Sequence, residues 1–247
     1  MKPTKGDLDS LDLSRLDDAL GACRFLLDHL GSDGSYVVSE RWGPESNLYL
    51  AEIAWPLLEA YRISGLPEML HGAERVLDRL ERLQKPTGGW TLDLGPDGLE
   101  FTASEEERRS TWEREDPPAV GAVAYAVAKY QDLTGSDRYR DMLERGLGYL
   151  LPLWNPEGGY FREDSEEHLS SLRSNPAAYQ AMYLLGLGEW RRWQPDLEPV
   201  VDRLIQSIRA AFESFDEETM PFMRAYHALL MLKHGDLAYA KRQVRPR

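Results

Sequence analysis

The stretch LTGSDRYRDMLERGLGYLLPLWNPEGGYF, residues 133–161, decides the fold of this chain. A Thr-Gly helix stop precedes Ser136 and Asp137, which are candidates for the N-cap of the next helix. Apolar residues then recur at helical spacing, namely Tyr139, Met142, Leu143, Gly146, Leu147, Leu150 and Leu151. Pro152 ends this predicted helix, and a Gly-Gly turn is expected to return Tyr160 onto the structure.

The same device occurs twice earlier in the chain. In each copy a glycine is followed, two residues later, by an aromatic residue: Tyr36, Trp90 and Tyr160. These rings are about 54 and 70 residues apart, which indicates an internal repeat. We expect each ring to pack near the end of its preceding helix and to have a structural role.

The predicted helices alternate between two compositions. Charged, amphipathic helices are expected at 13–30, 68–83, 137–151 and 197–213; helices richer in Ala, Gly and aromatic residues are expected at 47–63, 118–133, 176–190 and 221–234. A helix that is apolar nearly all round is enclosed, whereas an amphipathic helix lies at a surface. The pattern therefore predicts an all-α fold, an α/α toroid of about four outer/inner hairpins that forms a complete or an incomplete ring.

One domain accounts for most of the chain. Residues 13–235 are predicted to form the toroid, preceded by a flexible N-terminus, 1–12, and followed by a basic C-terminal tail, 236–247.

The repeats resemble those of known families. Arg145-Gly146-x-x-Tyr149-Leu150-x-x-x-Trp154-x-x-x-Gly158-x-Tyr160 and Gln84-x-x-x-Gly88-x-Trp90 resemble the QW repeat of terpenoid cyclases and protein prenyltransferases. The stretch 133–161 is similar as well to repeats of six-hairpin glycosidases, sugar 2-epimerases and uronic-acid-acting toroids. The segment NPAAYQAMYLLGLGEWRRW with the later Tyr226-His227 resembles the helical domains of uronyl C5-epimerases. The first group implies isoprenoid substrates, but its Asp-x-Asp-Asp motif and its zinc ligands are absent here; the other groups imply carbohydrate substrates.

Composition excludes several classes of partner. The net charge of −13 argues against nucleic acid and anionic membranes, which are polyanions. Cys23 is the single cysteine, and we expect it to be a buried structural thiol. No metal or other cofactor, no membrane span and a cytoplasmic location are expected. The expected partner is a small molecule, and the oligomeric state stays open.

Long loops, 31–46, 84–116 and 152–175, each join an outer helix to the next inner one, so they gather where the inner helices begin. Loops of this length are usually functional, and we call this end of the ring the mouth. The expected catalytic residues are Glu115, Asp116, Tyr226 and His227. The expected substrate-binding residues are Trp42, Glu45, Trp112, Glu113, Arg173, Tyr179, Tyr183 and Glu217.

Aromatic rings mixed with carboxylates suit a sugar site, because rings stack on apolar sugar faces and carboxylates bind hydroxyls or transfer protons. Helix capping explains any single acid, and core packing explains most of the tyrosines on the inner helices. The cluster of acids that follows Trp112 is what favours a site. The first hypothesis is a carbohydrate-active toroid, acting as a hydrolase, lyase or epimerase on a sugar or uronic acid. The alternatives are an isoprenoid-binding or cyclase-like protein and a toroid that serves as a non-catalytic scaffold or binding module.

Overall fold

The computed structural model describes residues 13–36, 47–91, 115, 117–162 and 176–213. Within these ranges the chain forms α2 (Leu13–Asp28), α3 (Asn47–Ser64), α4 (Pro67–Leu83), α6 (Pro117–Thr134), α7 (Arg140–Leu150), α9 (Pro176–Trp190) and α10 (Glu198–Glu213). Short 3₁₀ turns η2 (Leu151–Leu153) and η4 (Pro195–Leu197) and the antiparallel strands β1 (Trp154–Asn155) and β2 (Tyr160–Phe161) complete them. None of the described helices is both long enough and apolar enough to cross a bilayer.

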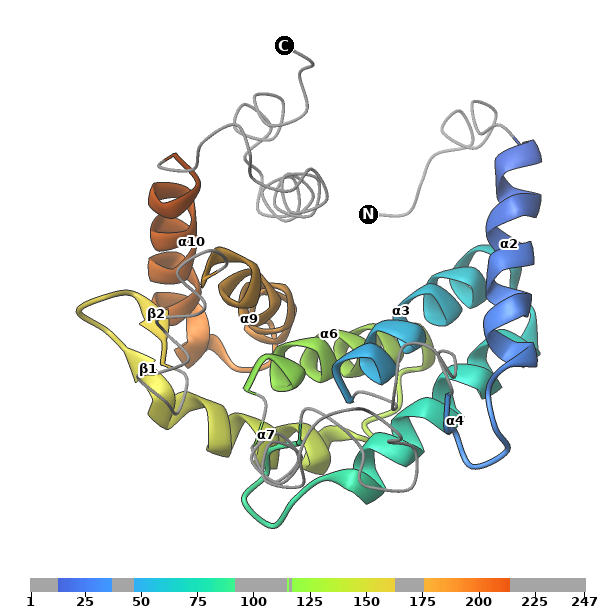
Figure 1. The fold of residues 1–247 in the computed structure, drawn as a ribbon, viewed down its shortest axis with the longest axis horizontal. Helices are drawn as coiled ribbons and strands as arrows, with labels where there is room; N and C mark the ends of the chain where they lie inside the picture. The colour runs from blue at the N-terminus through green and yellow to red at the C-terminus, as the bar shows by residue number, and fades with distance from the viewer. Residues whose placement is uncertain (1–12, 37–46, 92–114, 116, 163–175, 214–247) are drawn as a thin grey trace, which may run out of the picture.

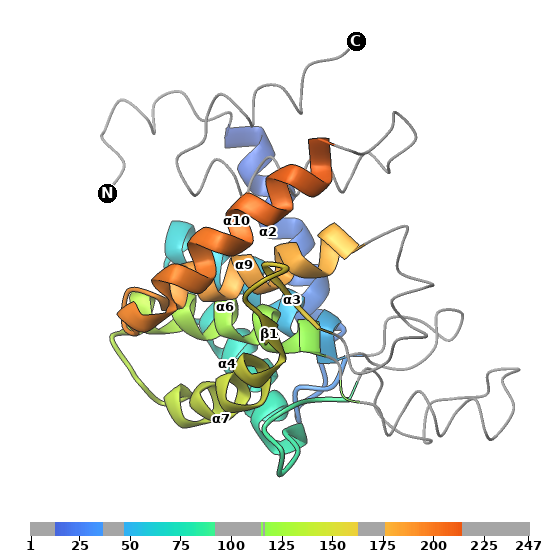
Figure 2. The ribbon, with the colours of Figure 1, turned by 90° about the vertical axis from the view of Figure 1, so that its left-hand side faces the viewer.

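The helices form an arc of two layers (Figure 1). The inner layer is α3, α6 and α9, in which α6 packs between the other two. The outer layer is α2, α4, α7 and α10; α2 and α4 pack on α3, α7 packs on α6 and α10 packs on α9. Figure 2 shows the same arrangement from the side. The α/α toroid prediction is confirmed, with three inner helices in the described part of the chain.

Burial follows the composition of each layer. Most of α6 is buried, including its first eight residues, whereas α4 buries one stripe and exposes the rest. Small residues let the inner helices approach closely: a Cβ on Gly121 would lie 2.4 Å from the Met182 carbonyl oxygen, and one on Gly186 would lie 2.2 Å from the Gly121 carbonyl oxygen. The Ala- and Gly-rich helices are therefore inner because only small side chains fit between their backbones.

The repeated glycines dock each turn onto the next outer helix. Gly34 and Gly88 have φ angles of 82° and 97°, in the left-handed region. A Cβ on Gly34 would lie 2.1 Å from the carbonyl oxygen of Arg75, and one on Gly88 would lie 2.2 Å from that of Arg145. The physical basis of the repeat is thus a backbone contact between successive outer helices.

Gln84 strengthens this contact in the second repeat. Its Nε2 donates to the carbonyl oxygens of Gly88 and Met142, at 2.8 Å each. Its Oε1 accepts a hydrogen bond from Arg145 Nε at 2.8 Å. One side chain therefore holds its own turn and also binds α7.

The aromatic residue that ends each repeat packs as predicted in the second repeat, and the third repeat buries a different ring from the predicted one. Trp90 is fully buried, and its Nε1 donates to the Leu80 carbonyl oxygen at 2.8 Å, near the end of α4. In the third repeat the left-handed glycine is Gly159, so the residue two positions later is Phe161. Phe161 is 1% exposed, whereas Tyr160 is only partly buried. The predicted register is therefore one residue off, because either glycine of the pair fits the pattern.

Three predicted segments lie outside the described residues: the fourth inner helix, 221–234, the N-terminal residues 1–12 and the tail 236–247.

Candidate functional site

Most residues predicted for the mouth lie outside the described part of the chain. These are the catalytic candidates Asp116, Tyr226 and His227 and the binding candidates Trp42, Glu45, Trp112, Glu113, Arg173 and Glu217. Tyr179 lies in the first turn of α9, where only the backbone is described. Their roles stay predictions.

Glu115 is the one mouth acid among the described residues. It is partly buried, its backbone pairs with Thr91, and its carboxylate accepts a hydrogen bond from the Thr87 hydroxyl. These contacts fasten the turn after α4 to the residue that precedes α6 by two positions. Glu115 thus has structural partners beside its predicted catalytic role.

Tyr183 is a core residue and leaves the list of candidate binding residues. Its side chain has no exposed surface, and its ring centroid lies 4.8 Å from that of Phe161. Its ring therefore packs against β2, with no surface left for a ligand. The alternative reading, core packing, holds for this tyrosine.

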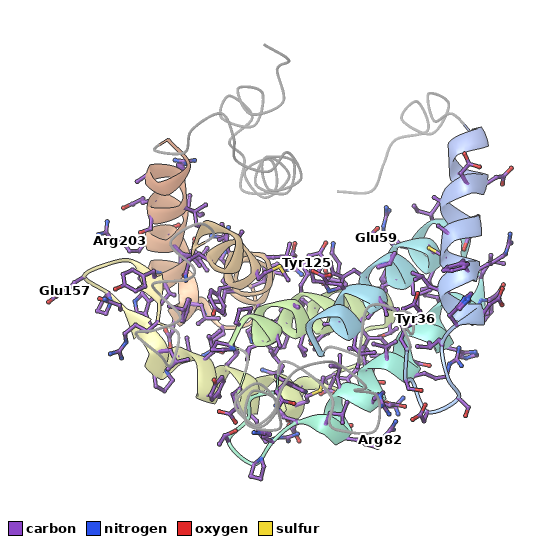
Figure 3. The ribbon with its side chains drawn as sticks, in the orientation of Figure 1. Tyr36, Glu59, Arg82, Tyr125, Glu157 and Arg203 are labelled. Atoms are coloured by element: carbon purple, nitrogen blue, oxygen red, sulfur yellow. The ribbon has the colours of Figure 1, made fainter. Side chains whose placement is uncertain are left out.

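The inner helices bring together a different set of residues, on the concave side of the arc. Trp55 and Glu59 come from α3, Tyr125 and Lys129 from α6, and Glu189 from α9. We call these five residues the central cluster. Figure 3 shows two of them, Glu59 and Tyr125, on the concave side.

The central cluster is built in layers because the inner helices start together at the mouth. Glu59 and Lys129 each lie twelve residues after the first residue of their helix, and Glu189 lies thirteen after. At 1.5 Å per residue this layer is roughly 18–20 Å from the helix starts. Trp55 and Tyr125 lie one helical turn nearer to the mouth.

The aromatic layer is held in a fixed geometry. The rings of Trp55 and Tyr125 meet edge to face, with centroids 5.0 Å apart and an interplanar angle of 78°. Trp55 Nε1 donates a hydrogen bond of 3.2 Å to the carbonyl oxygen of Ala122. Both rings are partly exposed, so each keeps surface available for a ligand.

The charged layer alternates in sign across the three helices. Lys129 Nζ lies 3.6 Å from Glu59 Oε1 and 5.5 Å from the centroid of the Tyr125 ring. Glu59 Oε2 also lies 2.6 Å from Arg62 Nε, and Glu189 Oε2 lies 3.2 Å from Arg192 Nη2. Each carboxylate therefore has a cation beside it on a partly buried surface.

Burial raises the pKa of two groups on this side of the arc, Tyr125 and Glu52. Desolvation raises the pKa of the Tyr125 hydroxyl, with Lys129 opposing the shift, so the phenol stays a proton donor at neutral pH. Glu52 lies on the same face of α3 as Trp55 and Glu59, at positions three and seven residues earlier. Burial raises the pKa of the Glu52 carboxyl, which suits it to exchange a proton.

The central cluster combines partly exposed rings, carboxylates, an ammonium group and a protonated phenol. Groups of these kinds can stack on a ring and form hydrogen bonds with hydroxyls. In the described ranges no three His, Cys, Asp or Glu side chains lie close enough to hold a metal ion.

No protein-family model and no curated protein sequence matches this chain.

Solved structures match this chain in fold. The fold is shared with sugar-converting enzymes. A D-mannose isomerase matches with a TM-score of 0.65 and 12% identity, over 93% of this chain and 68% of that one. A sugar epimerase from a ruminal bacterium matches with a TM-score of 0.60 and 13% identity, over 92% of this chain and 68% of that one. At these identities the similarity shows the fold alone.

The central cluster also leaves a signal in the amino-acid sequence. The tight turns after α3 and α6, at Gly65 and Gly135, are 70 residues apart, and the same interval relates Trp55 to Tyr125 and Glu59 to Lys129. Aligning the two hairpins on their turn glycines places these pairs at equivalent positions of two inner helices. The predicted site instead followed the long loops.

Proposed function

We propose that this protein is a sugar isomerase or epimerase whose substrate binds at the central cluster. The observation that supports it is the aromatic pair Trp55–Tyr125 beside the Lys129–Glu59 ion pair, on the concave side of a fold shared with a D-mannose isomerase and a sugar epimerase. Aromatic faces bind apolar sugar faces, and charged groups bind the hydroxyls and the carbonyl.

The reaction class needs a base and an acid but no redox cofactor. A base removes the proton from the carbon next to the sugar carbonyl, and the electron pair forms an enediolate. Return of a proton to the neighbouring carbon gives the isomer, and return to the opposite face of the same carbon gives the epimer. An ammonium group stabilises the enediolate oxygen.

The proposed roles follow from the side chains of the central cluster and of Glu52, on the same face of α3. Trp55 and Tyr125 orient the sugar ring, and the Lys129 ammonium lies near the developing negative charge. Glu52, with its raised pKa, is the proposed proton-transfer residue. The acids predicted at the mouth, Glu115 and Asp116, are the competing candidates for proton transfer. They compete with the central cluster because Glu115 lies about 20 Å from Lys129, by the length of α6, and cannot act on the same substrate carbon.

The test is exchange of the C2 proton of D-mannose for deuterium in D₂O, followed by NMR, because isomerisation and 2-epimerisation both begin with removal of this proton. Lys129→Met is expected to slow exchange by about 10²-fold or more. Arg140→Met is the matched control: it removes an exposed cation of the outer helix α7, paired with Glu144 at 2.9 Å, and is expected to leave the rate unchanged.

The other outcomes decide between the alternatives. Exchange lost in Glu115→Gln but kept in Lys129→Met places the chemistry at the mouth and overturns the central-cluster proposal. Absence of sugar exchange and binding, with binding of a prenyl diphosphate, favours the isoprenoid alternative. Failure to bind either class favours a scaffold.

A further inference from the structure

An apolar groove lies between α2 and α3, next to the central cluster. It has a volume of about 320 Å³, within the range of small-molecule sites, and its walls are almost entirely apolar. Its lining residues are Leu16, Ala19, Leu20, Ala22, Cys23, Leu26, Pro56, Glu59, Ala60 and Ile63.

The walls of this groove retain apolar surface that folding has not buried. Ile63 is 50% exposed, Ala19 and Ala22 are exposed, and the three leucines that contribute side chains are only partly buried. At its floor the Cys23 thiol donates to the Pro56 carbonyl oxygen at 3.6 Å. Burial raises the pKa of this thiol, so the floor is neutral as well as apolar. Filling the groove would therefore remove more apolar surface from water.

Glu59 belongs to both the groove and the central cluster. It is the one charged residue of the groove lining, and its carboxylate lies 3.6 Å from Lys129 Nζ. A ligand that fills the groove thus meets Glu59, which also pairs with Lys129 of the central cluster. Apolar walls that end at a few polar groups are complementary to an amphipathic ligand.

We propose that the groove binds a hydrocarbon chain attached to the sugar substrate. The inference rests on the proposed function and specifies its substrate class: a neutral reducing sugar that carries an alkyl or acyl chain on an oxygen away from C1. C1 must stay free because the proposed reaction needs the open-chain carbonyl. Neutral sugars are favoured because Lys129 of the central cluster and the neighbouring Arg62 and Arg192 already face carboxylates.

The test is calorimetric binding of D-mannose carrying a 6-O-methyl, 6-O-butyl or 6-O-octyl group. Affinity is expected to rise about fourfold for each methylene that enters the groove and to level off when the groove is full. Ala19→Phe, which fills the groove, is expected to abolish the gain and to leave methyl-ether binding unchanged. Asp18→Phe adds the same ring at a neighbouring exposed position outside the groove lining and is expected to keep the gain.

A second readout locates the chain independently of affinity. Because Cys23 is the single cysteine, its reaction with a small maleimide reports on the groove alone. The octyl ether is expected to slow this reaction in proportion to the occupied fraction, and the methyl ether is expected to leave it unchanged.

Each contrary result has a separate meaning. Binding of the methyl ether with no gain from longer chains, or a gain that persists in Ala19→Phe, overturns the groove inference and leaves the proposed function standing. Protection of Cys23 by octan-1-ol, with no binding of any sugar ether, overturns both in favour of a purely apolar ligand. No binding of any probe also overturns both.

Discussion

Trp90 joins two successive outer helices through one buried side chain. Its ring lies against α7, where a Cβ on Gly146 would approach it to 3.2 Å, and its Nε1 donates to the Leu80 carbonyl oxygen of α4. Trp90→Ala is expected to lower the free energy of unfolding by about 3–5 kcal/mol, because a cavity replaces the ring. Urea denaturation measures this, and a loss well under 1 kcal/mol would show that the ring does not pack as described.

Glu52 is expected to make the stability of the protein depend on pH. Its folded-state pKa is raised by burial, so the folded protein holds this proton more tightly than the unfolded chain. The associated stability is present below the unfolded pKa of about 4.3 and is lost as the pH rises through the folded pKa. Glu52→Gln stays neutral, so the free energy of unfolding of the variant relative to wild type should increase with pH above about 4.3. Urea denaturation at several pH values checks this, and a difference independent of pH would contradict it.

Among the elements, the turns after the outer helices are the most constrained. Gly88 combines a left-handed φ of 97° with a backbone oxygen, that of Arg145, 2.2 Å from where a Cβ would lie. Gly88→Ala should therefore destabilise the protein by more than about 2 kcal/mol. Gly148, within α7, has open space around its Cβ position, so Gly148→Ala should stabilise by about 0.5–1 kcal/mol. Thermal and urea denaturation of the two variants measure both signs, and equal effects would refute the docking role of the turn.

The third turn also shows what a sequence pattern leaves undecided. The pair Gly158-Gly159 allows two registers, and only the backbone φ of 71° at Gly159 selects Phe161 over Tyr160 as the buried ring. Phe161→Ala is accordingly expected to cost about 3–5 kcal/mol, and Tyr160→Ala distinctly less. Urea denaturation compares the two, and the reverse order would restore the predicted register.

Over the whole molecule, composition predicts the two-layer arrangement, whereas the central cluster leaves only the 70-residue interval between equivalent positions of α3 and α6 as a trace in the sequence. Composition alone separates Ala- and Gly-rich α6 from amphipathic α4, since burial depends on the whole surface of a helix. The pairing of Glu59 with Lys129 depends instead on how α3 and α6 are rotated and aligned, which local periodicity does not determine. The place of Tyr125 beside Lys129 likewise follows only from the packing of the helices.

The central claim is that a sugar binds between the inner helices, and fluorine NMR of 5-fluorotryptophan-labelled protein tests it most directly. The chain has seven tryptophans, and single Trp→Phe variants assign their resonances. Titration with D-mannose is predicted to shift the Trp55 resonance saturably and to leave that of fully buried Trp90 unchanged. Saturable shifts confined to Trp42 or Trp112, with Trp55 unmoved, would place the sugar at the mouth and contradict the account.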